Sequence, residues 1–295
     1  MKTIRAQHVI EAVKELCVKA NYCLPPSVTE AIRACREAES WGPAQNVLDR
    51  ILENGEIARE GVFPACQDTG ITCVFVELGQ DAHVEGNLKD AVDEGVRRAC
   101  AEGYLRRSVV SDPLSRVNTG DNAPAIISFD LVGGDKLKLT VAPKGAGSEN
   151  MSRLVMLKPS DGRRGVIDFA VETVRLAGSN PCPPVVVGVG IGGSFDQVAA
   201  LAKKALLRPL GQPHPERRYA ELESEILAEI NRLGIGPAGF GGDTTALAVA
   251  VEYRPTHIAM LPVAVNINCH VARFQSAVLE GEDHADPTYD APDQG

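Results

Sequence analysis

The sequence predicts an α+β fold, in which a helical N-terminal region is followed by a mixed β-sheet with flanking helices. Three observations support this prediction. Apolar residues recur at helical spacing from residue 3 to about residue 62. Short segments with alternating or continuous apolar residues, typical of strands, begin only after residue 70. Further helical patterns separate these segments, and 295 residues suffice for one large domain or two modest ones.

Residues 1–62 are predicted to be a helical opening. Residues 3–20 form the first helix, because their apolar positions share one stripe at helical spacing. That stripe consists of Val9, Val13, Leu16 and Ala20. Two prolines end this helix, a second helix covers residues 28–38, and a third begins at Pro43, a favoured first-turn residue.

Residues 63–278 are predicted to form a mixed α/β body. Its strands are expected at residues 71–78, 126–132, 137–142, 185–189, 247–251 and 258–267. Its helices are expected from an N-cap at Asn87 to about Gly103, and at residues 163–177, 195–207 and 220–233. The turn sequence at residues 133–136 predicts a β-hairpin over residues 126–142, and the last two strands are predicted to pair with each other in the same way.

The charge of the chain is concentrated at its C-terminal end. Six of the nine excess negative charges lie in residues 280–295, so residues 279–295 are predicted to be an acidic, disordered tail. The body, residues 1–278, is then nearly neutral and has no basic stripe with interleaved aromatic residues, which argues against nucleic-acid binding. No apolar run is long enough to span a bilayer and no secretory signal is visible, so we expect a cytoplasmic protein without a membrane partner.

The eight cysteines do not follow a zinc-ribbon or ferredoxin pattern, because no Cys-x-x-Cys pair occurs. Disulfides are not expected in a chain of this kind. Several cysteines lie within apolar patterns and are interpreted as small buried hydrophobic residues. Cys66, Cys182 and Cys269 differ, because each lies where a predicted regular element meets a turn. They are the candidate reactive or ligating thiols.

Three polar segments are candidates for a site. Residues 64–70, Pro-Ala-Cys-Gln-Asp-Thr-Gly, are either a solvated turn or a site, because a core gains nothing from such polar groups in series. Residues 112–122 form a long polar loop, which is either an ordinary surface loop or functional. Gly145 and Gly147 create either an anion-binding turn or a flexible one.

The sequence Ala-Cys-Gln-Asp-Thr-Gly at residues 65–70 resembles the signature of the cluster-binding half of class I fumarate hydratases and L-tartrate dehydratases. Further blocks resemble that family in the family's order. They are Asn-Thr-Gly-Asp-Asn at 118–122, Gly-Ala-Gly-Ser at 145–148, Gly-Ile-Gly-Pro at 234–237, Gly-Gly-Asp-Thr-Thr at 241–245 and Asn-Cys-His at 268–270. The resemblance covers about residues 64–271 and implies the fold of the class I fumarase N-terminal domain.

The resemblance implies that Cys66, Cys182 and Cys269 ligate a [4Fe-4S] cluster. Three protein thiolates leave one iron of such a cluster open, so that this iron can act as a Lewis acid in a reversible hydration. His270, beside the third cysteine, is expected to be structural. The Gly-x-Gly-x-x-Gly match at residues 188–193 is the competing signal, for a dinucleotide. It lacks the second parallel strand with its acidic residue, so we interpret these glycines as bringing the backbone close to the cluster or substrate.

The same resemblance assigns roles around a small dicarboxylate substrate. Asp68 is the candidate catalytic residue, in the proton-transfer network on the oxygen side. Arg106, preferred to Arg107, would hold a substrate carboxylate through the two parallel hydrogen bonds that guanidinium favours. The remaining substrate-binding candidates are Gln67, Gly147 and His257.

Together these residues predict the α-subunit of a two-subunit [4Fe-4S] hydro-lyase. Fumarate hydratase, which interconverts fumarate and L-malate, is the first choice, because the Ser-Glu-Asn sequence at 148–150 looks closer to the two-subunit fumarases. The α-subunit of an L-tartrate or related dehydratase is the alternative, and a non-catalytic iron-sulfur or nucleotide-binding regulatory protein is the remote one. The resemblance implies a separate β-subunit that completes the active site, in a heterotetramer or similar assembly in which the α-subunit also dimerises.

Overall fold

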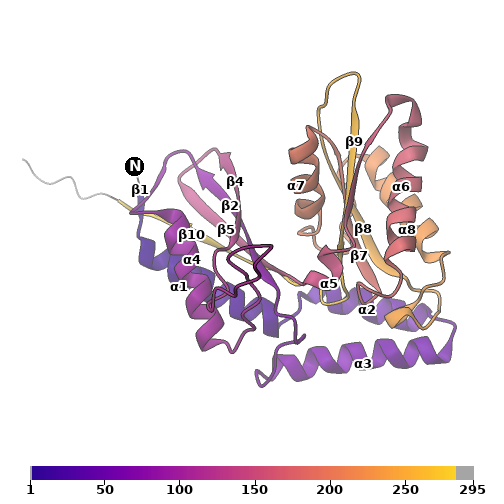
Figure 1. The fold of residues 1–295 in the computed structure, drawn as a ribbon, viewed down its shortest axis with the longest axis horizontal. Helices are drawn as coiled ribbons and strands as arrows, with labels where there is room; N and C mark the ends of the chain where they lie inside the picture. Colours follow the sequence, from indigo (N-terminus) through magenta and orange to yellow (C-terminus); the bar gives the residue numbers. More distant parts are fainter. Residues whose placement is uncertain (1, 284–295) are drawn as a thin grey trace, which may run out of the picture.

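The computed structural model describes residues 2–283, which form two lobes, and a pair of helices lies across the base of one of them (Figure 1). Each lobe is built around its own four-stranded mixed sheet with helices packed on it. The predicted α+β class is therefore confirmed, with two four-stranded sheets and a third sheet of three short strands in place of a single sheet. Each four-stranded sheet has its own hydrophobic core, as expected for a chain of this length.

The helical opening is largely as predicted. It contains α1 (Ala6–Tyr22), α2 (Pro26–Ala38) and α3 (Gly42–Arg59). Pro26 and Pro43 lie in the first turns of α2 and α3, where their missing N–H groups cost nothing. Before α1, however, Lys2–Ile4 forms a short strand, β1, which pairs with β3 (Ala82–Val84). The first residues were predicted to be helical, but their backbone hydrogen bonds are made to a distant segment.

The first lobe contains β2 (Ile71–Gly79), α4 (Leu88–Glu102), β4 (Ile126–Val132), β5 (Lys136–Lys144) and β10 (Gln275–Glu280). The strand order is β10-β5-β2-β4, and α1 packs against α4 on the sheet. The predicted hairpin of β4 with β5 is wrong, because β2 lies between them, parallel to β4 and antiparallel to β5. Most of β2 is apolar and buried, so it is most stable as a central strand with neighbours on both sides.

The second lobe repeats this arrangement. Its elements are β6 (Arg153–Leu157), α6 (Gly162–Ala177), β7 (Val185–Gly192), α7 (Phe195–Ala205), α8 (Arg217–Asn231), β8 (Ala246–Arg254) and β9 (Leu261–Asn268). The strand order is β6-β9-β7-β8. The predicted pairing of β8 with β9 is wrong for the same reason, because the buried strand β7 lies between them. In both lobes a helical connection joins two parallel strands, and the next strand returns on the far side of the first.

The glycines of β7 fit against a helix. A Cβ on Gly188 would lie 2.1 Å from the carbonyl oxygen of Ala202, and one on Gly190 would lie 2.3 Å from that of Val198. Both carbonyls belong to α7, so the absent side chains let this helix pack directly on the strand. The interpretation that Gly188 and Gly190 approach a cluster or substrate was wrong, and the dinucleotide interpretation gains no support from them.

The end of the described chain is part of the fold. β10 runs to Glu280, and Glu282–Asp283 forms β11, which pairs with β1. The predicted tail began at residue 279, but its first acidic residues are held by basic partners, Glu280 by Lys136 at 2.5 Å and Glu282 by Arg5 at 2.7 Å. The remainder of the predicted tail, residues 284–295, lies outside the described residues. Within residues 2–283, none of the helices combines the length and apolar character needed to cross a bilayer.

Candidate metal centre

The fold brings together the ends of three elements that are far apart in the sequence. Cys66 lies in the loop between α3 and β2, Cys182 lies in the turn before β7, and Cys269 directly follows β9. Val186 of β7 pairs with Asn268 of β9 in antiparallel register, so the start of one strand lies beside the end of the other. Two of the three candidate ligands are therefore placed at one end of the second sheet.

Contacts through neighbouring residues connect the three cysteines. Cys66 and Cys269 pack against the same small group of buried apolar side chains, Leu24, Ala58, Ala65 and Val271. The backbone N–H of His270 donates to the carbonyl oxygen of Cys182 at 3.4 Å. The His270 ring nitrogen Nδ1 lies 2.9 Å from the same oxygen and must donate, because a carbonyl only accepts. His270 is thus a structural link between the second and third cysteines.

The surroundings of Cys182 and Cys269 raise the pKa of both thiols. Burial raises the pKa of Cys269, and the neighbouring Arg273 opposes this rise only in part. Burial, followed by the nearby Cys66, also raises the pKa of Cys182. Cys182 has a φ of 53°, an unusual conformation for a residue other than glycine and one that is concentrated at functional sites. Metal binding would have to displace the thiol protons.

The three thiols are compatible with the donors of an iron-sulfur cluster. Among residues 2–283, no group of three or more His, Cys, Asp or Glu side chains is arranged to hold one metal ion. In a cubane cluster each thiolate binds a different iron, so its ligands do not converge on one atom. Three thiols from three segments, beside the buried cation Arg273, match the donors and the charge that such a cluster requires.

Asp68 connects the signature loop (residues 64–70) to the glycine turn (residues 145–147) that follows β5. Its carboxylate accepts hydrogen bonds from the backbone N–H of Gly70 at 3.0 Å and from that of Ala146 at 2.9 Å. Ala146 begins the short helix α5 (Ala146–Glu149), which contains Gly147. A Cβ on Gly147 would lie 3.5 Å from the carbonyl oxygen of Asn180, two residues before Cys182. Asp68 and Gly147 therefore both lie at the cysteine centre.

Arg106 is brought to the same loop through its backbone. Its N–H donates to Thr69 Oγ1 at 2.8 Å, although the two residues are 37 positions apart. Buried Asn122 supports this connection, since its amide donates to the carbonyl of Gly70 and accepts from the N–H of Ser108. The Arg106 side chain is exposed, and it makes no ion pair or hydrogen bond with another residue in the described part of the chain. Gln67, also exposed, lies in the same loop.

His257 is not brought to the cysteines of its own chain. It lies in the loop between β8 and β9, where it is exposed and its Nδ1 accepts the N–H of Ala259 at 3.2 Å. Thr256 of this loop bonds to the carbonyl of Gly193, just past the end of β7. Cys182 lies before the start of β7, and an eight-residue strand spans about 25 Å. The loop containing His257 is thus at the opposite end of the sheet, at the top of Figure 1.

A buried charged network next to the site was not predicted. Lys144, 4% exposed, donates to Ser148 Oγ at 3.0 Å and to the carbonyl of Ile267 at 2.7 Å, and pairs with Glu149 at 3.2 Å. Arg273, 3% exposed, was not singled out either. The sequence offered the same signal for the burial of Lys144 and Arg273, because each basic residue directly follows apolar residues.

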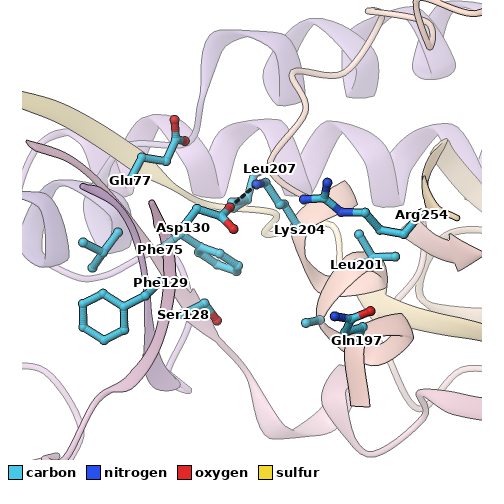
Figure 2. Close-up of a pocket in the computed structure, with 12 residues that line it drawn as sticks. Phe75, Glu77, Ser128, Phe129, Asp130, Gln197, Leu201, Lys204, Leu207 and Arg254 are labelled. Atoms are coloured by element: carbon cyan, nitrogen blue, oxygen red, sulfur yellow. Dashed lines mark hydrogen bonds and ion pairs between the residues drawn. The ribbon is translucent and has the colours of Figure 1, made fainter. Parts of the chain in front are cut away.

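A cleft between the two lobes lies apart from the three cysteines. It has a volume of about 280 Å³ and lies between the sheet of the first lobe and α7 of the second (Figure 2). Figure 2 shows Lys204 of α7 paired with Asp130 of β4, with Gln197 and Arg254 on the same side of the cleft as Lys204. No cysteine lines this cleft. The Lys204–Asp130 ion pair connects the two lobes at this cleft, which is not the candidate metal centre.

Comparisons with known proteins identify a family and several relatives of this chain. The family model described as fumarate hydratase (Fumerase) matches residues 10–278. A Methanocaldococcus jannaschii protein named "Putative L(+)-tartrate dehydratase subunit alpha" is 45% identical over 272 residues, covering 90% of this chain and 95% of that protein. The L(+)-tartrate dehydratase subunit alpha of Escherichia coli O157:H7 is 33% identical over 284 residues, covering 95% and 92%. That of strain K12 is 32% identical over the same length, with the same coverage.

Proposed function

Because this chain belongs to the fumarate hydratase (Fumerase) family, we propose that it is the α-subunit of an iron-sulfur hydro-lyase that acts on a small hydroxy-dicarboxylate. One observation carries the proposal. Cys182 and Cys269 lie at one end of a sheet, and Cys66, from a distant segment, packs against the same buried residues as Cys269. The electrostatic influence of these cysteines on one another and on the buried Arg273 supports a common centre.

Cys66, Cys182 and Cys269 are the residues that would hold a [4Fe-4S] cluster. When bound, such a cluster supplies an iron without a protein ligand, which can polarise the hydroxyl group that leaves the substrate. The surrounding helix ends and strands fix the three sulfur positions before binding, so little order must be gained on assembly.

The exposed groups beside the cysteines bind and orient the substrate. The Arg106 guanidinium, held in place through its backbone, grips one carboxylate, and the Gln67 amide donates to the same dianion. Asp68 already accepts one backbone N–H on each carboxylate oxygen, so its position is fixed while a lone pair remains on each oxygen. That carboxylate takes part in proton transfer on the oxygen side of the substrate. The exposed Gly147 leaves the room that a side chain would fill.

The relatives favour L(+)-tartrate over fumarate as the substrate. The relatives described above are named tartrate dehydratase α-subunits, and the first is 45% identical over nearly its full length. We therefore prefer the alternative, dehydration of L(+)-tartrate, to the fumarate hydratase expected from the Ser-Glu-Asn sequence at 148–150. Fumarate hydratase is retained as the second candidate, because the matching family carries that name. Both substrates are four-carbon dicarboxylates, so Arg106 could bind a carboxylate group of either one.

A β-subunit covers the cysteine centre in this proposal. The relatives are named as α-subunits, and the site is open on the side of Gln67 and Arg106. Large apolar side chains are exposed on three segments that border it, namely Phe63 (66% exposed), Tyr104 (88%) and Phe240 (68%). Phe63 is three residues before Cys66, Tyr104 is two before Arg106, and Phe240 follows a turn bonded to Pro183. Exposed apolar groups around a polar centre are typical of a protein interface.

The assignment of His257 depends on the assembly. Because His257 lies at the far end of the sheet from its own cysteines, it can contact substrate only in the site of another subunit. Replacement of His257 by Asn should therefore lower activity in the assembled enzyme and leave the iron content of the chain unchanged.

The test is anaerobic reconstitution with iron and sulfide, followed by a visible spectrum and by assays with the β-subunit. We expect a broad band near about 400 nm, and water elimination from L(+)-tartrate that is faster than hydration of fumarate. Cys182→Ser should lose most of the band, whereas Cys23→Ser, which changes a cysteine outside the centre, should keep it. A wild-type chain that stays colourless would refute the hydro-lyase proposal, and a preference for fumarate would restore the second candidate.

A further inference from the structure

Arg273 is the least satisfied buried charge near the cysteines. Its side chain lies behind the signature loop, and its Nη2 donates to the carbonyl oxygen of Asp68 at 2.5 Å. Nε and Nη1 are both buried and have no hydrogen-bond partner among residues 2–283. Unpaired donors on a buried cation are costly, so an acceptor is expected in the functional protein.

The groups that face Arg273 identify the kind of acceptor. Burial lowers the pKa of Arg273, and Cys269, then Cys66, then Asp68 oppose that change. No carboxylate forms an ion pair with Arg273 among the described residues, and its hydrogen bond to Asp68 goes to the backbone carbonyl oxygen. The other buried cation near Cys269, Lys144, has its own carboxylate partner, Glu149. Arg273 thus leaves a net positive charge beside the two cysteines.

Water does not meet this requirement. A water molecule could accept one of the hydrogen bonds, but it would leave the charge uncompensated. An exposed arginine such as Arg106 suits a substrate carboxylate, whereas Arg273 is 3% exposed and close enough to Cys66 and Cys269 for their electrostatic influence on its pKa. The acceptor that fits this position is anionic, buried and close to these two cysteines.

We propose that Arg273 donates hydrogen bonds from Nε and Nη1 to sulfur atoms of the iron-sulfur cluster and offsets its negative charge. This inference rests on the proposed function, and it gives Arg273 a role as a hydrogen-bond donor to the cluster, not as a ligand to iron. Hydrogen bonds to sulfur and nearby charge are among the main determinants of a cluster's reduction potential. A positive charge stabilises the more reduced state, so Arg273 raises that potential.

The first test uses the cluster-free full chain. Removal of an uncompensated buried charge costs little, so Arg273→Gln should melt close to the wild type before reconstitution. After reconstitution, the wild type should gain more thermal stability than Arg273→Gln does. A cluster-free Arg273→Gln chain that melts far below the wild type would show that Arg273 serves the Asp68 loop alone, and would overturn the inference.

The second test measures the midpoint potential of the reconstituted chain by redox titration with electron paramagnetic resonance. Arg273→Gln should shift the potential to a more negative value, and Arg273→Lys, which keeps the charge, should shift it less. Arg208→Gln is the matched control, because Arg208 is also largely buried but is paired with Glu223 and Glu252 away from the cysteines. That control should lose stability without a change in potential. Equal potentials for the wild type and Arg273→Gln would overturn the inference.

The two proposals fail in different ways. A wild-type chain that takes up no iron would refute the proposed function itself. A wild type with a normal cluster, whose potential is insensitive to Arg273, would refute only the role of this arginine.

Discussion

At the scale of single residues, charged side chains near the candidate site are buried or half-buried, and ion pairs offset the cost of their burial. Glu149 accepts from Lys203 at 2.5 Å and from Asn266 at 2.9 Å, in addition to its pairing with Lys144. Burial alone would raise the pKa of Glu149, but the two lysines outweigh it and lower the pKa to about 2. These contacts connect the glycine turn to β9 and α7, and so support two walls of the candidate metal centre.

This network predicts an acid-sensitive contribution to stability. A carboxyl group whose pKa falls from 4.5 to about 2 on folding stabilises the folded state above pH 4.5, and that stability is lost as the pH falls towards 2. Because 34% of the Glu149 side chain is exposed, we expect about 2 kcal/mol, less than the full shift implies. Urea unfolding of Glu149→Gln should show this loss at pH 7 and a much smaller one at pH 3.

Glu172→Gln is the matched control for this prediction. Glu172 pairs only with Arg175 on the surface of α6 and should contribute little at either pH. A destabilisation by Glu149→Gln that is the same at pH 7 and pH 3 would contradict the linkage.

At the scale of elements, each helix and strand follows local sequence signals. Asn87 caps α4 by accepting the N–H groups of Lys89 and Asp90, as its position before the helix predicted. Prolines begin α2 and α3, and the apolar stripe of α1 is buried. Pairing between strands did not follow the order of the chain, because the largely apolar strands β2 and β7 each lie between the two strands that were predicted to pair.

The contact between β7 and α7 gives a prediction about packing. A Cβ on Gly190 would lie 2.3 Å from Val198 O and 2.7 Å from Ala202 N, both in the backbone of α7. Gly190→Ala should therefore push the helix away from the strand and destabilise the fold by about 3 kcal/mol. Gly133→Ala, where nothing lies within 4 Å of the new methyl group, should be nearly neutral. Thermal or urea unfolding of both variants tests this, and equal stabilities would contradict it.

At the scale of the whole molecule, two lobes with the same strand order form the two sides of the candidate site. The first lobe supplies the signature loop, the glycine turn and the segment with Arg106, while the second supplies Cys182 and Cys269. The Lys204–Asp130 pair and the cleft of Figure 2 join the lobes away from the cysteines. The positions of the candidate site residues therefore depend on the contacts between the two lobes. The open side of the site is where we propose that the partner subunit binds.

The proposed β-subunit interface is testable through its exposed apolar groups. Phe63→Ser and Phe240→Ser should each weaken binding of the β-subunit by about tenfold, since buried aromatic side chains dominate interfaces. Both variants should take up iron normally. Leu176→Ser on α6, also exposed at 52%, should bind as the wild type does. Titration of labelled β-subunit measures the affinities, and an unchanged affinity for both phenylalanine variants would place the interface elsewhere.

By itself, the sequence determined the α+β class, the positions of most helices and strands, and the three cysteines worth following. These depend on local spacing, capping and turn residues, which act over a few positions. Only the tertiary structure decided the strand order, the distance of His257 from the cysteines, and the burial of Arg273 and Lys144 beside them. These depend on which distant segments compete successfully for a central, buried place, and no local pattern encodes the outcome of that competition.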